Sequence, residues 1–118
     1  MTYEDFNRFC AALPATSHVV QWGGSQVWKV GGKVFAIGGW DQGAPAFTFK
    51  VSALSFEILK ALPGLRPAPY LASRGMTWIQ RYGDPGLSDD ELKDYIRESH
   101  RFVALGLTRL RRRELGLD

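Results

Sequence analysis

Three Gly-Gly pairs, at residues 23–24, 31–32 and 38–39, constrain the fold more than any other feature of this sequence. The runs between them are rich in Val, Trp, Phe and Ile, which are typical of β-strands. A Gly-Gly pair permits the positive φ angles of a two-residue hairpin turn, so the first two pairs predict a three-stranded antiparallel meander. The third pair precedes a longer loop and therefore indicates a bend.

Two-residue turns would also fix the register of this meander. They place Trp28 opposite Phe35, and Val20 opposite Val27. One face, which we expect to be the core, then collects Val19, Trp28, Val30, Phe35 and Ile37. The other face, which we expect to be amphipathic and at least partly exposed, collects Val20, Trp22, Val27, Val34 and Ala36 with Lys29 and His18.

Helix caps and apolar periodicity predict the remaining elements. Thr2 with Asp5, and Ser88 with Glu91, have the spacing of capping boxes, and Ser52 can cap a third helix. The predicted elements are a helix that Pro14 ends, a strand over 46–51, a short helix over 53–62, an extended connector over 65–75, a fifth strand over 76–82, a long helix to about residue 105 and a short basic helix over about 108–115.

Length and composition indicate one domain over residues 1–118. At 118 residues and 45% hydrophobic content, the chain can bury a core without disulfide support. Its one cysteine, Cys10, has no partner for an internal disulfide, which favours a reducing, cytoplasmic location. No apolar run approaches the roughly 20 residues of a membrane span, and the N-terminus does not resemble a signal peptide. We expect an α+β fold, with N- and C-terminal helices on one face of an antiparallel sheet of about five strands.

The net charge of +3 conceals separate blocks of charge. Residues 1–59 carry four basic and four acidic side chains, and residues 60–83 carry four basic side chains and no acidic one. Residues 84–98 sum to −4, and residues 99–118 to +3. Blocks of this size can attract anionic partners, although the same pattern also serves to solvate a surface.

Templates for catalysis and metal binding are missing from the sequence. Neither GxxxxGK nor GxGxxG occurs, and the two histidines and single cysteine lack the spacing of metal ligands. A nucleophilic Cys10–His100 pair is conceivable, but Cys10 lies on the apolar stripe of the first helix, where a buried structural cysteine is far commoner. We therefore expect no catalytic residue, no enzymatic activity, no cofactor and no metal.

Basic residues interleaved with aromatic residues are the remaining functional signal. Lysines contact phosphates and free aromatic faces stack on bases, whereas in a structural interpretation the aromatics build the core and the lysines keep the sheet soluble. Trp22 is the best candidate for a free aromatic, followed by Trp40.

In this order of elements the chain resembles the MmcQ/YjbR proteins, the DUF419 group. The resemblance covers about residues 2–115. Its most specific parts are the strand–Gly-Gly–Lys–strand hairpin over 27–37, the junction at 50–52, the connector over 69–71 that leads to Trp78, and the closing segment over 99–107. It implies a frataxin-like α+β fold and DNA binding through a double wing of hairpins. The acidic ridge with which frataxins bind iron is not matched here, so the resemblance implies no iron site.

The hypothesis that follows is a non-enzymatic, double-wing DNA-binding module that contacts the phosphate backbone. Its expected nucleic-acid-binding residues are Lys29, Lys33, Lys50, Arg74, Arg81 and Trp22. The alternative is a module that binds a small ligand or a partner protein on an exposed sheet face. Under either hypothesis the chain is a monomer or a homodimer, with no membrane association.

Overall fold

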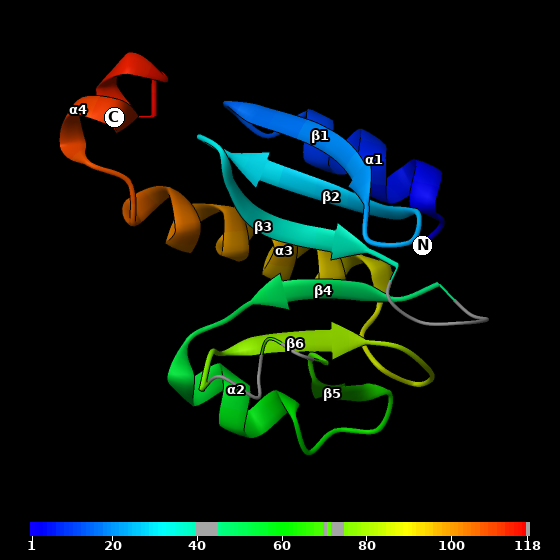
Figure 1. Ribbon diagram of the computed structural model, residues 1–118. Coiled ribbons are helices and arrows are strands. Elements are labelled where there is room, and N and C mark those ends of the chain that lie inside the picture. The colour runs from blue at the N-terminus through cyan, green and yellow to red at the C-terminus, as the bar shows by residue number, and fades with distance from the viewer. Residues whose placement is uncertain (40–44, 70, 72–74, 118) are drawn as a thin grey trace.

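The computed structural model describes residues 1–39, 45–69, 71 and 75–117. Four helices and six strands occur in this part of the chain (Figure 1). In chain order they are α1 (Tyr3–Ala11), β1 (Thr16–Gln21), β2 (Ser25–Val30), β3 (Lys33–Gly38), β4 (Phe47–Lys50), α2 (Ala53–Leu59), β5 (Leu65–Pro67), β6 (Trp78–Arg81), α3 (Asp89–Leu105) and α4 (Arg109–Glu114).

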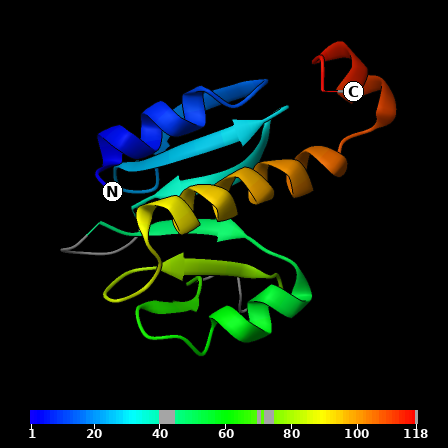
Figure 2. The same ribbon diagram turned by 180° about the vertical axis from the view of Figure 1, so that it is seen from behind.

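The strands form one antiparallel sheet in the order β1-β2-β3-β4-β6-β5. Helices α1 and α3 cover the same face, which lies behind the sheet in Figure 1 and in front of it in Figure 2. The α+β class is confirmed. The strand count differs by one because Leu65–Pro67, expected to be part of a connector, pairs with β6 as an edge strand.

Both predicted capping boxes are present. The Thr2 hydroxyl accepts a hydrogen bond from the Asp5 N–H at 3.0 Å, and the Ser88 hydroxyl accepts one from the Glu91 N–H at 3.2 Å. In return, the Ser88 N–H donates to the Glu91 carboxylate, which lowers the pKa of that carboxyl. These pairs satisfy N–H groups that have no partner within the helix, and thereby fix where α1 and α3 begin.

The first hairpin turn has three residues rather than two, so the register predicted for β1 is wrong. Gln21 pairs with Ser25, and Val19 with Val27. Trp22 supplies the extra residue in a left-handed conformation with φ of +53°. A shift of one residue moves every side chain to the opposite face. Val19 therefore leaves the helix-covered face, and Val20 joins it.

A β-bulge produces the second departure from the predicted register. Trp28 pairs with Ala36 and Lys29 with Val34, which leaves Phe35 as the extra residue of β3. The expected Trp28–Phe35 pair is therefore wrong. Beyond the bulge Ala36 joins Trp28 on the helix-covered face, whereas Ile37 pairs with Val27 on the other.

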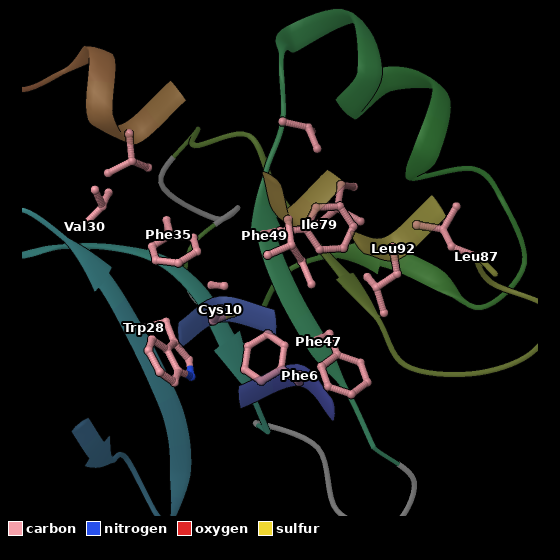
Figure 3. Packing of buried hydrophobic residues seen from close by; sticks show 14 of the residues in the cluster. Phe6, Cys10, Trp28, Val30, Phe35, Phe47, Phe49, Ile79, Leu87 and Leu92 are labelled. Carbon is pink, nitrogen blue, oxygen red and sulfur yellow. The ribbon is translucent and has the colours of Figure 1, made fainter. Parts of the chain in front are cut away.

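The core lies between the sheet and the helices. Figure 3 shows Phe6 and Cys10 of α1 among aromatic side chains of the strands, with Leu92 of α3 beyond them. The Phe6 and Phe47 rings lie 5.1 Å apart between centroids. Cys10 is completely buried, as its place on the apolar stripe of α1 predicted.

One hydroxyl from α3 completes the backbone hydrogen bonding at the bulge. Ser99 Oγ donates to the Phe35 carbonyl at 2.6 Å and accepts from the Lys50 N–H at 2.8 Å. These two groups belong to adjacent strands, β3 and β4. Ser99 is fully buried, so both hydrogen bonds are shielded from bulk solvent. Ser99 therefore bridges the strands and ties α3 to the centre of the sheet.

The face turned away from α1 and α3 is buried at its centre. A row of directly paired residues crosses this face, and it comprises Val19, Val27, Ile37, Thr48, Gln80 and Arg66. Val27, Ile37, Thr48 and Gln80 are at most 1% exposed. The expectation of a partly exposed face is therefore wrong for Val27, although Val34 and Lys29 are half-buried.

No helix in the described ranges is both long enough and apolar enough to span a membrane.

Replacing Ser99 by alanine should lower the free energy of unfolding by about 2–3 kcal/mol, because a buried N–H and a buried carbonyl each lose their partner. Urea denaturation measures this change. Ser17→Ala on exposed β1 is the control and should change stability by less than about 0.5 kcal/mol. Equal effects of the two substitutions would contradict the bridging role.

Candidate nucleic-acid interface

The tip of the β2–β3 hairpin packs against the C-terminal segment. A Cβ atom built on Gly31 would lie 2.7 Å from Leu107 Cδ1 and 2.9 Å from Leu115 Cδ1, closer than side chains normally approach. Gly31 also has a φ of +56°, which favours glycine. The missing side chain thus allows the hairpin tip and the two ends of α4 to meet. Figures 1 and 2 both show α4 beside this turn.

This contact brings together two basic segments that are far apart in the sequence. Lys33 begins β3 at the hairpin tip, and α4 carries exposed Arg109, Arg111 and Arg113. We refer to Lys33, Arg109, Arg111 and Arg113 as the basic end. Only Arg111 among these four has an ion-pair partner in the described ranges, at 3.4 Å from Glu114. The basic end therefore presents guanidinium and ammonium groups that can contact an external anion.

Arg112 has a structural position in the same helix. Its guanidinium Nη1 donates to the carbonyls of Leu105 at 3.1 Å and Leu107 at 2.9 Å. Both carbonyls belong to the segment where α3 ends and turns towards α4. Arg112 thereby holds α4 against the end of α3 while its neighbours in sequence remain exposed.

Lys29 and Lys50 lie on the sheet face away from α3. Each alternates along its strand with a residue of the helix-side core, Trp28 in β2 and Phe49 in β4. Both lie near the ends of their strands on the side of the molecule that carries α4 (Figure 1). They are half-buried, so they are less exposed than the residues of the basic end.

The structure separates Arg81 from these lysines. Arg81 ends β6, at the opposite end of the sheet from α4, and pairs with Phe47 and Leu65. Its guanidinium lies 3.4 Å from the Asp84 carboxylate, and its side chain is 19% exposed. The partners and burial of Arg81 indicate a structural position.

Trp22 also lies away from the basic end. It occupies the β1–β2 turn, on the opposite side of the molecule from the β2–β3 turn (Figure 1). Its side chain is half exposed. Two further candidates, Arg74 and Trp40, fall outside the described residues.

Helix α3 separates the charges of the molecule along its length. Its first turn carries Asp89, Asp90 and Glu91, and its C-terminal end leads into α4. The 17 residues of α3 span about 25 Å, so the acidic cap lies far from the basic end relative to the screening length of about 8 Å at physiological salt. The acidic residues that lower the net charge therefore do not neutralise the arginines of α4.

The sequence revealed the arginine-rich tail but not its position in the site. A run of charges indicates a local field without indicating which surface lies beside it. The one available signal was Gly31, because a glycine in a hairpin turn can also mark a close approach of another segment.

The environment of Cys10 disfavours a nucleophilic thiol. Burial raises the pKa of its thiol far above the usual range, which disfavours the reactive thiolate. His100 is also buried, and its Nε2 lies 2.8 Å from the Pro14 carbonyl oxygen. No group of three or more His, Cys, Asp or Glu side chains within the described ranges is arranged to hold a metal ion.

A family model and one solved structure identify the family of this chain. The family model described as YjbR matches residues 11–102. A crystal structure of the Deinococcus radiodurans protein DR2400, with a DUF419 domain, superposes with a TM-score of 0.84 and 25% identity, covering 99% of this chain and 89% of that one. A Pseudomonas syringae protein superposes with a TM-score of 0.69 and 18% identity, covering 86% of this chain and 98% of that one, and shares the fold. No curated protein matches the chain in sequence.

Gly31→Ala should loosen the contact between the hairpin and α4, because the new methyl group would displace Leu107 or Leu115. Gly32→Ala is a matched control, since Gly32 also has positive φ, +86°, but has no neighbouring atom within 4 Å. Both substitutions should cost about 1–2 kcal/mol for the left-handed backbone. Only Gly31→Ala should accelerate tryptic cleavage at Arg109–Arg113. Equal cleavage rates in the two variants would contradict a packing role for Gly31.

Cys10 should resist thiol reagents while the protein is folded, because its thiol is buried and its pKa is raised. Absorbance after addition of a disulfide reagent at mildly alkaline pH should show negligible reaction without denaturant. One thiol per chain should react in denaturant. Rapid labelling of the folded chain would show that Cys10 is accessible after all.

Proposed function

This chain belongs to the YjbR family, and we propose that it is a non-enzymatic DNA-binding module that contacts the phosphate backbone of duplex DNA through its basic end. The single observation that carries the proposal is the packing of the β2–β3 hairpin tip against α4. That packing combines Lys33 with Arg109, Arg111 and Arg113 in one region.

The chemistry of the basic end suits phosphates more than base edges. Arginine and lysine neutralise phosphates and release condensed counterions, which gives affinity without sequence preference. Helix α4 has only six residues, so it is short for a helix that reads bases along the major groove. We therefore propose binding that depends on backbone contacts and falls steeply with salt.

The alternative of a ligand- or partner-binding module on an open sheet face has less support. It depended on a set of apolar side chains exposed on the face away from the helices. Val27 is completely buried on that face, and Val20 lies on the opposite one. Val34 stays on that face but is half-buried, and exposed Trp22 lies at the turn rather than on the face.

The test is a fluorescence-anisotropy titration of a labelled DNA duplex at low salt, repeated at increasing salt. The wild-type chain should bind, with affinity that decreases linearly on a double-logarithmic plot. The double variant Lys33→Glu/Arg113→Glu should weaken binding at least about tenfold, and its salt dependence should be shallower by about one unit of slope for each lost contact.

The control is Arg8→Glu/Lys60→Glu, which changes the net charge equally at two exposed positions on α1 and beside α2. It should reduce the affinity far less than the basic-end variant. Equal losses would mean that only net charge matters, and no binding by the wild-type chain at low salt would refute the proposal.

A further inference from the structure

We propose that the chain forms a two-fold symmetric homodimer in which β1 pairs antiparallel with β1 of a second copy, so that the two sheets join into one. This inference is independent of DNA binding. It rests on the backbone, the composition and the location of β1, the outermost strand on its side of the sheet.

The hydrogen-bonding pattern identifies which groups of β1 are available. The Gly31 N–H donates to the Ala15 carbonyl at 3.3 Å, which continues the β1–β2 ladder by one pair beyond Thr16 and Val30. In an antiparallel ladder, every second pair of residues exchanges hydrogen bonds. The backbone groups of Thr16, His18 and Val20 therefore point away from β2. Within the described ranges, no hydrogen bond satisfies them.

The side chains of β1 do not protect this edge. Exposed edge strands usually carry a charged residue, most often lysine, or a proline that prevents pairing with a further strand. The six residues of β1, TSHVVQ, include neither lysine, arginine, aspartate, glutamate nor proline. The side chains of Val19 and Val20 are 37% and 56% exposed, so pairing would also bury apolar surface.

The opposite edge of the sheet is protected, which favours a closed dimer. Strand β5 has three residues and ends at Pro67, which has no N–H to donate. Copies therefore cannot add indefinitely through alternating edges. A β1–β1 joint uses the unprotected edge of both copies at once, and this isologous contact stops at two.

Charge also permits a second copy at this edge. The chain has a net charge of +3, but the charges of residues 1–59, which include strands β1, β2 and β3, sum to zero. The excess of basic residues lies in the second half of the chain. The basic end lies beside the start of β1, and an antiparallel joint places the two basic ends at opposite ends of the contact, so they do not face each other.

Symmetry restricts the register of the joint. Residues whose backbone groups point away from β2 must pair with the same kind of residue in the second copy. The longest overlap of the two β1 strands then places the two-fold axis beside either His18 or Val19. An axis beside His18 would oppose two imidazoles, whereas one beside Val19 opposes two valines and pairs His18 with the partner's Val20. We assign the Val19 register, in which the two Val19 Cα atoms would lie about 4.5 Å apart.

Sedimentation velocity over a wide concentration range tests the dimer, with Val20→Pro and Val20→Thr as matched variants. Proline removes an N–H that the isolated fold does not use, whereas threonine keeps it with a similar shape. Wild type and Val20→Thr should dimerise. Val20→Pro, which deletes two intermolecular hydrogen bonds, should raise the dissociation constant about thirtyfold. Should proline disturb folding, Val20→Lys repeats the test with a protective charge.

Cysteine cross-linking tests the register. Val19→Cys should form a disulfide-linked dimer under mild oxidation, because the expected Cα separation suits a disulfide. Gln21→Cys, on the same face but displaced from the axis, should not. Buried Cys10 should not interfere. Cross-linking by Gln21→Cys but not Val19→Cys would overturn the assigned register.

Two results would overturn the dimer itself. One is a wild-type chain that stays monomeric at its highest soluble concentration, which would leave β1 free for another chain. The other is a dimer that Val20→Pro does not weaken. That result would point to another surface, such as the exposed apolar stripe of Leu54, Ile58 and Leu62 beside and along α2.

Discussion

The Ser99 bridge at the bulge in β3 determines how the long helix crosses the sheet. Where the bulge interrupts regular pairing, the Ser99 hydroxyl supplies both an acceptor for Lys50 and a donor for Phe35. This places one point of α3 at the boundary between β3 and β4. Because a helix is stiff, fixing that point and the capped start at Ser88 also fixes where α3 ends. The position of the C-terminal segment depends on that direction.

The C-terminal end of α3 leads into α4 and so places the basic residues of α4 beside the β2–β3 hairpin. Leu107 follows directly and lies against Gly31, while Arg112 binds the carbonyls of Leu105 and Leu107. The basic end is therefore an outcome of packing, since apolar contacts and backbone hydrogen bonds place its charges. Its lysine and arginines need no contact with one another, so they stay available to an anionic partner.

The sequence predicted the elements well because local chemistry determines them. Thr2, Ser52 and Ser88 each cap a helix at the expected place, and glycine pairs follow β1 and β2. The registers were harder to predict, because a left-handed Trp22 and a bulge at Phe35 each shift a strand by one residue. Neither feature has a local sequence signal, since Trp and Phe are ordinary strand residues and tertiary packing decides both conformations.

The candidate site shows the same division between local and long-range information. Lys33 could be identified from the hairpin alone, because its position follows from the Gly-Gly turn. Arg109, Arg111 and Arg113 could not be assigned to the same surface, because their location depends on the path of α3 and on the small volume of Gly31. Conversely, Arg81 has the charge of a phosphate-binding residue, but its side chain is largely buried and forms an ion pair with Asp84, which indicates a structural position.

The burial pattern limits how this fold can associate. Helices cover one face of the sheet, and the central row of the other face, including Thr48 and Gln80, is completely buried. A partner that needs an open sheet face is therefore excluded from the centre of both faces, and association shifts to the rim. At the rim, Pro67 protects the edge strand β5, whereas β1 presents unpaired backbone groups. The tip of the β2–β3 hairpin, together with α4, presents positive charge. The proposed dimer depends on backbone groups of β1 and the proposed DNA contact on side chains of the basic end, so substitutions can separate the two.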